Sequence, residues 1–344
     1  MKSLVTKTFA VLALTAVTAV ASEVLWVEFD AVRPYLGGKA PVLVDVPPGT
    51  RSIVIARLLE DSGVIRSRYT FLILHYIKRQ RTLKAGTYSF EKPLTPKEIM
   101  RELISGEVAK QEITIPEGYN RFDIAALMES AGFATREDFL KAAAETSIIA
   151  DLDPTAPNLE GYLFPDTYQF PRHGGATPVV REMVSRFRKV YKTLLPKGQR
   201  VSAHDVVTIA SMIEGETGNA EERPVVESVF YNRLRRGLPM QCDPTVIYAA
   251  ILQNSFGGVI RKADLNSNSP YNTYIHPGLP PGPISNPGKA SLVAALRPAS
   301  TKFLYFVANN TGRHTFSRTL TEHNLAVSLY RRGLAEKADD KSDR

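Results

Sequence analysis

The sequence AHDVVTIASMIEGE, residues 203–216, has the period of a buried helix. Its apolar side chains fill a wide arc of that helix: Val206, Val207, Ile209, Ala210, Met212 and Ile213. The polar or small residues of the other side are His204, Thr208, Ser211 and Gly215. At about 100° per residue, Glu214 falls within the apolar arc. The pattern therefore predicts a core helix that carries a carboxyl group on its buried side.

Glu214 is the candidate catalytic residue of this helix. Loss of water around a carboxyl group raises its pKa and prepares a proton donor that works near neutral pH. The alternative is a structural ion pair between Glu214 and an arginine of the next predicted helix, Arg223 or Arg233. Glu216 lies about 200° from Glu214 around the helix, so we expect these two side chains to point to opposite sides.

Composition limits the possible classes of protein. The chain has 344 residues, 44% of them hydrophobic, and a net charge of +8, which indicates a globular protein of two or three domains. The basic residues form no recognition module, so we expect no nucleic-acid partner. A single cysteine, Cys242, excludes an intrachain disulfide. Neither metal-ligand spacing nor a glycine-rich phosphate loop is present, so we expect no metal and no cofactor.

The N-terminal segment predicts export. Lys2 and Lys7 precede the apolar stretch 8–21, and Glu23 interrupts it before residues 24–27 resume it. We read residues 1–29 as a single-pass anchor in the inner (cytoplasmic) membrane, or as a signal segment cleaved after Ala19-Val20-Ala21. Residues 30–41 are a linker. Either interpretation places the rest of the chain on the periplasmic, extracytoplasmic side.

The remaining sequence predicts an α+β protein of two domains. Residues 42–110 have a β-α-β-α pattern, whose last helix begins at the capping residue Thr95 and ends at Gly106. Residues 111–335 form a mixed α+β domain with a helical subdomain at about 120–150. A charged tail, 336–344, follows. The larger domain contains the helix with Glu214, so we assign the reaction to it.

Several ordered blocks carry a family resemblance. They are 210–217 (ASMIEGET), 228–234 (SVFYNRL), 241–248 (QCDPTVIY), 269–274 (SPYNTY), 278–284 (GLPPGPI), 295–299 (ALRPA), 304–308 (LYFVA) and 314–316 (HTF). Together they closely resemble the MltG-type (YceG-like) endolytic murein transglycosylases, over nearly the whole chain. The resemblance implies a membrane-anchored enzyme, a LysM-like domain at 42–110 and a lysozyme-like catalytic helix with Glu214 at the position of the catalytic glutamate. Cys242 departs from the small hydroxyl residue expected at its position.

The resemblance also implies a reaction and a site. Glu214 would act as general acid and then as base in cleaving the MurNAc-GlcNAc bond of peptidoglycan without water, leaving 1,6-anhydro-MurNAc ends. The expected substrate-binding residues are Glu160, Tyr162, Gln241, Asp243, Asn272 and Tyr274. Beyond glycan strands, the implied partners are peptidoglycan synthases, and the implied role is terminating or trimming nascent strands.

Two other functions remain open. A muramidase would hydrolyse the same bond, and its second carboxylate would come from Asp243 or Glu160. A non-catalytic peptidoglycan-binding scaffold would need no reactive carboxyl at all. His314 is read as a structural residue rather than a catalytic one.

Overall fold

The computed structural model describes residues 2–77, 82–172, 174–195 and 201–342. The chain divides into two compact units, the first made of residues 1–112 with 169–175 and the second of residues 113–168 with 176–344. Small antiparallel sheets and many helices make up both units, which confirms the α+β class. The boundary near residue 112 lies close to the predicted domain boundary.

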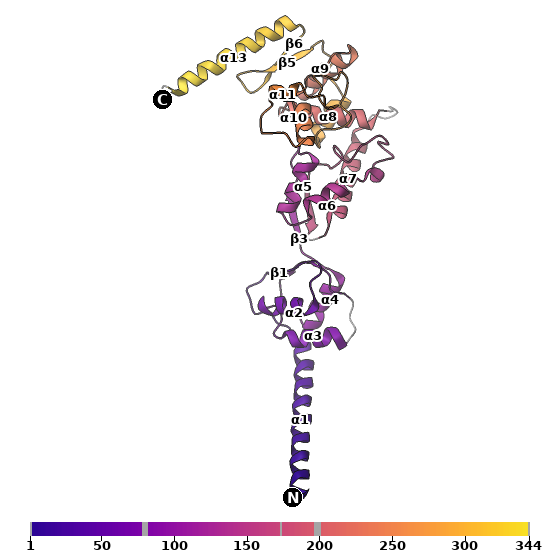
Figure 1. Cartoon of the computed structure of the whole chain (residues 1–344), viewed down its shortest axis with the longest axis vertical. Coiled ribbons are helices and arrows are strands. Elements are labelled where there is room, and N and C mark those ends of the chain that lie inside the picture. The colour runs from indigo at the N-terminus through magenta and orange to yellow at the C-terminus, as the bar shows by residue number, and fades with distance from the viewer. Residues whose placement is uncertain (1, 78–81, 173, 196–200, 343–344) are drawn as a thin grey trace. The chain divides into compact units, whose positions relative to one another are not determined.

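The first unit contains a helix followed by a β-α-α-β-α module (Figure 1). Its elements are α1 (Lys2–Ala31), β1 (Val42–Val46), α2 (Ser52–Asp61), α3 (Arg68–Ile77), β2 (Gly86–Phe90) and α4 (Pro96–Ser105). The β-α-β-α pattern is therefore corrected, because the turn at Gly63 divides the segment between the strands into two helices. The predicted cap of α4 is confirmed: Thr95 and Glu98 form a capping box, and Gly106 ends the helix with a positive φ.

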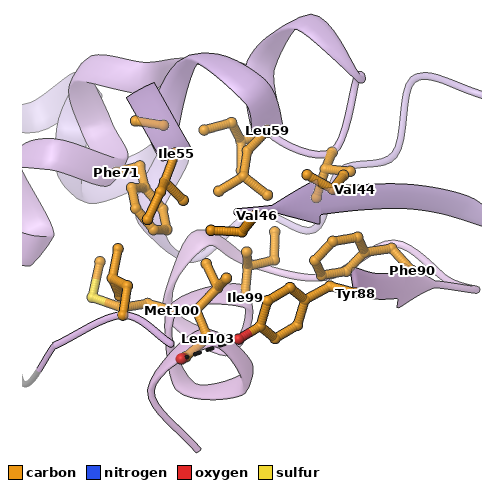
Figure 2. Close-up of a cluster of buried hydrophobic side chains, with 14 of the residues drawn as sticks. Val44, Val46, Ile55, Leu59, Phe71, Tyr88, Phe90, Ile99, Met100 and Leu103 are labelled. Atoms are coloured by element: carbon orange, nitrogen blue, oxygen red, sulfur yellow. Dashed lines mark hydrogen bonds between the residues drawn. The ribbon is translucent and has the colours of Figure 1, made fainter. Parts of the chain in front are cut away.

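A separate hydrophobic core holds the first unit together. β1 and β2 pair in antiparallel register, Val44 opposite Tyr88, and their inward side chains meet the apolar faces of α2, α3 and α4. Figure 2 shows these buried side chains turned toward one another, and the Tyr88 hydroxyl donates to the Leu103 carbonyl at 3.4 Å. The alternating burial of both strands is the expected consequence of a period of two.

α1 covers the segment in which the anchor was expected. Its C-terminal end packs on α3 and α4 of the same unit. Among the residues that the structure describes, no helix has the length and apolar character required to cross a bilayer. The predicted single-pass anchor over residues 1–29 is therefore not supported.

The second unit is mainly helical. Its helices are α5 (Arg121–Ser130), α6 (Arg136–Ala142), the short 3-10 helix η1 (Thr146–Ile148), α7 (Ala176–Leu194), α8 (Ala203–Glu216), α9 (Arg223–Arg235), α10 (Asp243–Leu252), α11 (Lys262–Leu265), α12 (Lys289–Leu296) and α13 (Leu320–Ser342). β5 (Tyr305–Ala308) pairs with β6 (His314–Ser317), and β3 (Lys110–Thr114) pairs with β4 (Thr167–Pro171) where the chain passes between the units. α5 and α6 lie within residues 120–150, where the sequence predicts a helical subdomain.

Candidate active site

α8 is the central helix of the second unit. It covers residues 203–216 as predicted and begins at Ser202, whose hydroxyl accepts the Asp205 N–H. α9, α10 and α12 pack around it, and its apolar arc is buried. Figure 1 shows α8 with α9 and α10 in the second unit. This packing fixes the C-terminal end of α8, which presents Glu214 and Glu216 to two different environments.

Glu214 is held in an ion pair. One carboxylate oxygen accepts from Arg223 Nη2 at 2.9 Å, and the other accepts from the Gly288 N–H at 2.9 Å. Only 6% of the Glu214 side chain and 9% of the Arg223 side chain are exposed. The structural alternative considered for Glu214 is thus present, with Arg223 as the partner. Both carboxylate oxygens of Glu214 are thus already engaged by groups of the protein itself.

Glu117 lies beside this pair. Its carboxylate is 3.9 Å from Arg223 Nη2, and its Oε1 occupies the space that a side chain on Gly288 would fill, 1.8 Å from an ideal Cβ. Burial and the charge of Glu214 raise the pKa of Glu117. One arginine therefore lies within 4 Å of two carboxyl groups, at the point where the N-terminus of α12 meets α8.

Glu216, two residues further on, opens into a cavity of about 480 Å³. The cavity is lined by Glu216, Arg233, Met240, Gln241, Asp243, Tyr274, Phe306, Val307, Ala308, His314 and His323. Burial raises the pKa of Glu216 to about 7, against hydrogen bonds from the Cys242 thiol and the Asp243 backbone that favour the carboxylate. A large fraction of Glu216 is thus protonated near neutral pH and faces space that a ligand can enter.

Three of the predicted binding residues line this cavity. Gln241 has a φ of 53°, which is rare outside glycine, and its side-chain oxygen accepts from Arg233 Nη1 at 3.0 Å. The Tyr274 hydroxyl donates to Asp243 Oδ1 at 2.5 Å. Gln241, Asp243 and Tyr274 therefore share one cavity with Glu216, whereas the lining of this cavity does not include Glu214, around which they were predicted.

The structure places the other three away from it. Glu160 is buried, accepts from the Arg121 N–H, the Tyr248 hydroxyl and the Asn286 amide, and has a pKa raised by burial to about 7. The Tyr162 hydroxyl donates to Asp153 in the core.

Asn272 is also fully buried, and its amide donates to the backbone oxygens of Leu265 and Ser267. Its oxygen accepts the Tyr274 N–H at 3.0 Å. Asn272 thus shapes the loop that carries Tyr274, and Glu160 and Tyr162 have core partners where groove contacts were expected.

Glu216, Arg233 and His314 are cavity residues to which sequence reasoning gave no substrate contact. The apolar arc of residues 203–216 predicts a buried carboxyl group at Glu214 and gives Glu216 no functional role. Glu216 ends α8 just after Gly215, where a Cβ would lie 2.8 Å from Pro244 of α10.

A second cavity, of about 570 Å³, lies on the other side of this contact. Gly215 and Pro244 line it, together with Phe122, Arg136 and Phe256 among others. Within the described ranges, no cluster of three or more His, Cys, Asp or Glu residues is arranged to hold a metal ion.

The cavity places a carboxyl group whose pKa burial raises to about 7 beside an amide, a tyrosine and a second carboxyl group. Such a combination is suited to general acid catalysis. The chain belongs to the YceG-like family, whose model matches residues 44–328.

Similar proteins support this assignment. The chain is 34% identical over 311 residues to an endolytic murein transglycosylase of Bacillus subtilis (strain 168), covering 85% of each chain. It is 29% identical over 336 residues to one of Streptococcus pneumoniae serotype 2 (strain D39), covering 87% of this chain but 60% of that relative. The crystal structure of a YceG-like protein of Listeria monocytogenes superposes with a TM-score of 0.54 at 32% identity, covering 83% of this chain and 99% of that chain.

Proposed function

We propose that this protein is an endolytic murein transglycosylase, a lyase that cuts the glycan strands of peptidoglycan. Its membership of the YceG-like family and its two named relatives support the substrate and the reaction class. The observation that carries the chemistry is the cavity around Glu216, which combines a carboxyl group whose pKa burial raises to about 7 with polar side chains suited to sugar amides.

Within this function, we assign the general acid to Glu216. The sequence-based assignment to Glu214 stays a prediction, but Arg223 and the amide of Gly288 already occupy its two carboxylate oxygens. Glu216 has the near-neutral pKa and the open cavity that an acid catalyst needs.

The reaction needs one proton donor. Glu216 donates its proton to the GlcNAc O4 as the bond from this oxygen to MurNAc C1 breaks, while the substrate's acetamido group stabilises the positive charge developing at C1. The MurNAc O6 then bonds to C1, and the proton released from this hydroxyl restores the acid form of Glu216. The product is a 1,6-anhydro end, and no water is consumed.

A muramidase is the second candidate, and one observation favours it. Asp243 lies in the Glu216 cavity and supplies the second carboxylate that hydrolysis requires, although Tyr274 binds one of its oxygens. Glu160, the other carboxylate considered for this role, is buried in the core.

Product analysis separates the candidates. Purified peptidoglycan strands are digested with the full chain and with an Asp243→Asn variant, and the fragments are identified by mass spectrometry. Anhydro ends from the wild type support the transglycosylase. Reducing ends that disappear with Asp243→Asn would replace it with a muramidase, and the absence of any fragments would favour a binding scaffold.

The location of the activity follows from the substrate. Because peptidoglycan lies outside the cytoplasmic membrane, we place the activity on the extracytoplasmic side. The LysM-like character of residues 42–110, the membrane anchor, the association with peptidoglycan synthases and the trimming of nascent strands stay predictions from the family resemblance.

A further inference from the structure

A histidine held by a carboxylate faces the same cavity as Glu216. His314 of β6 lines the cavity, and its Nδ1 lies 2.7 Å from Glu222 Oε2. The other Glu222 oxygen accepts the backbone N–H of His314 at 2.9 Å. Glu222 thus binds the residue at two points, which fixes both the backbone and the ring.

The hydrogen bonds from His314 keep Glu222 in its carboxylate form. Burial of Glu222 opposes ionisation, but the hydrogen bonds from the His314 backbone and ring outweigh it and lower the pKa of Glu222. A carboxylate only accepts hydrogen bonds, so His314 Nδ1 donates its hydrogen to Glu222. Nε2 is the ring nitrogen left for a ligand, and no hydrogen bond occupies it in the part of the chain that the structure describes.

Packing restricts the ring further. The Phe306 ring meets His314 edge to face, with centroids 5.4 Å apart at 89°, and only 16% of the His314 side chain is exposed. The ring is therefore oriented before any substrate binds, as a proton-transfer group should be. The titratable or charged groups around it are Glu216 from α8, Arg233 from α9, Asp243 from α10, Tyr274, His323 from α13, and the neighbouring Arg313–Glu221 pair.

We propose that His314 is a second catalytic residue of the murein transglycosylase reaction, accepting the proton of the MurNAc C6 hydroxyl as O6 bonds to C1. The electron pair of the broken C1–O4 bond stays on O4, which takes the Glu216 proton. The C6 hydroxyl proton passes through His314 Nε2 to the Glu216 carboxylate, so no proton is gained or lost overall. Glu222 is the positioning residue, because it acts through the ring and does not touch the substrate. This inference rests on the proposed function and names the general base of its reaction.

The pH dependence of catalysis tests this role. A base must be unprotonated, so activity that uses His314 falls as the pH decreases, while activity that uses protonated Glu216 falls as the pH increases. The value of kcat/KM on glycan strands is therefore measured between about pH 5 and 9 for the wild type, His314→Gln and Glu222→Gln. The matched control is His204→Gln, because His204 Nδ1 also lies 2.7 Å from a carboxylate, Asp153, in the same unit.

We expect His314→Gln to lower kcat/KM at neutral pH about 100-fold and to remove the decline on the acid side. Glu222→Gln should shift that decline to lower pH, because the imidazolium loses its negative partner. His204→Gln should keep the wild-type profile.

An unchanged acid-side decline in His314→Gln would overturn the inference, as would a loss of activity no larger than that of the control. If His314→Gln does not fold, the direction of the Glu222→Gln shift decides in its place. A wild type that releases no anhydro ends would instead contradict the proposed function itself, so the two failures are distinguishable.

Discussion

Two glutamates on one helix differ because their neighbours differ. Glu214 and Glu216 are separated by Gly215 alone, yet one meets an arginine and a backbone amide while the other meets a cavity. Such environments separate the roles of chemically identical carboxyl groups. The sequence predicted that they point apart and offered Arg223 or Arg233 as a partner of Glu214. It could not choose between these two arginines, because the contact depends on the turn between α8 and α9.

The raised pKa of Glu216 predicts the behaviour of catalysis at alkaline pH. Because the acid form donates the proton, kcat/KM should fall about tenfold per pH unit once the pH exceeds about 7. Initial rates of fragment release at constant ionic strength measure this. A rate that stays constant well above the pKa of Glu216 would show that a different group donates the proton.

Glu227 of α9 gives a prediction about stability. Its side chain is almost fully buried, one carboxyl oxygen has no partner among the described residues, and burial raises its pKa to about 8. Between the ordinary pKa of a glutamate and about 8, the Glu227 carboxyl group is protonated in the folded protein and ionised in the unfolded chain. The free energy of unfolding that depends on Glu227 therefore falls as the pH rises through this range.

Glu227→Gln should therefore reduce the fall in melting temperature between weakly acidic and neutral pH. Calorimetry at several pH values measures the slope. An unchanged slope would mean that Glu227 does not retain its proton in the folded protein. Glu160 and Glu216, whose pKa values are also raised, should maintain part of the dependence in the variant.

At the scale of the elements, hydrophobic periodicity and capping residues predicted local structure, such as where a single helix begins and ends. α8 begins and ends at the predicted residues, and the α4 capping box was readable from Thr95 and Glu98. The sequence could not predict the cavity, because the residues that line it are far apart in the chain. They come from the ends of α8 and α9, from β5 and β6, and from the loop that carries Tyr274. Gln241, Asp243 and Tyr274 came from the family resemblance, whereas Asn272 and Glu160 show that the same resemblance also identifies residues with structural contacts.

The loop at residues 159–168 approaches α8 so closely at Gly161 that there is no room for a side chain. The φ of Gly161 is +87°, and a Cβ there would lie 2.6 Å from Pro283 and from Val207 of α8. Gly161→Ala should therefore lower the free energy of unfolding by roughly 2–4 kcal/mol, from backbone strain plus overpacking. Chemical denaturation of the full chain measures the loss.

The control for this substitution is Gly237→Ala. Gly237 also has a positive φ, +63°, but a Cβ there would meet no atom within 4 Å. It should cost only the strain of a left-handed residue, about 1 kcal/mol. Equal losses in the two variants would show that contact between the loop and α8 is not what constrains Gly161.

At the scale of the whole molecule, the chain has two separate cores. The cluster around Leu59, Phe71 and Tyr88 lies wholly in the first unit, and that around Met212, Phe230 and Tyr248 lies wholly in the second. Composition and length predicted a multidomain protein, and the glycine and proline punctuation gave the approximate boundary. How strands and helices would order within the first unit needed the structure.

Separate cores predict separable unfolding. Leu59 is fully buried, so Leu59→Ala should remove about 2–5 kcal/mol from the first unit. Calorimetry should show one transition moving to lower temperature while a second stays in place. A single transition that shifts as a whole would show that the units unfold together.

The most direct test of the central claim compares the two glutamates of α8 on purified glycan strands. Glu216→Gln should reduce anhydro-ended fragments at least about 100-fold while the protein stays folded. Glu214→Gln should lower the melting temperature, because Arg223 loses its charged partner, and should still release anhydro ends from the folded protein. Loss of activity in a folded Glu214→Gln variant, with activity kept in Glu216→Gln, would contradict the assignment and return the catalytic role to Glu214.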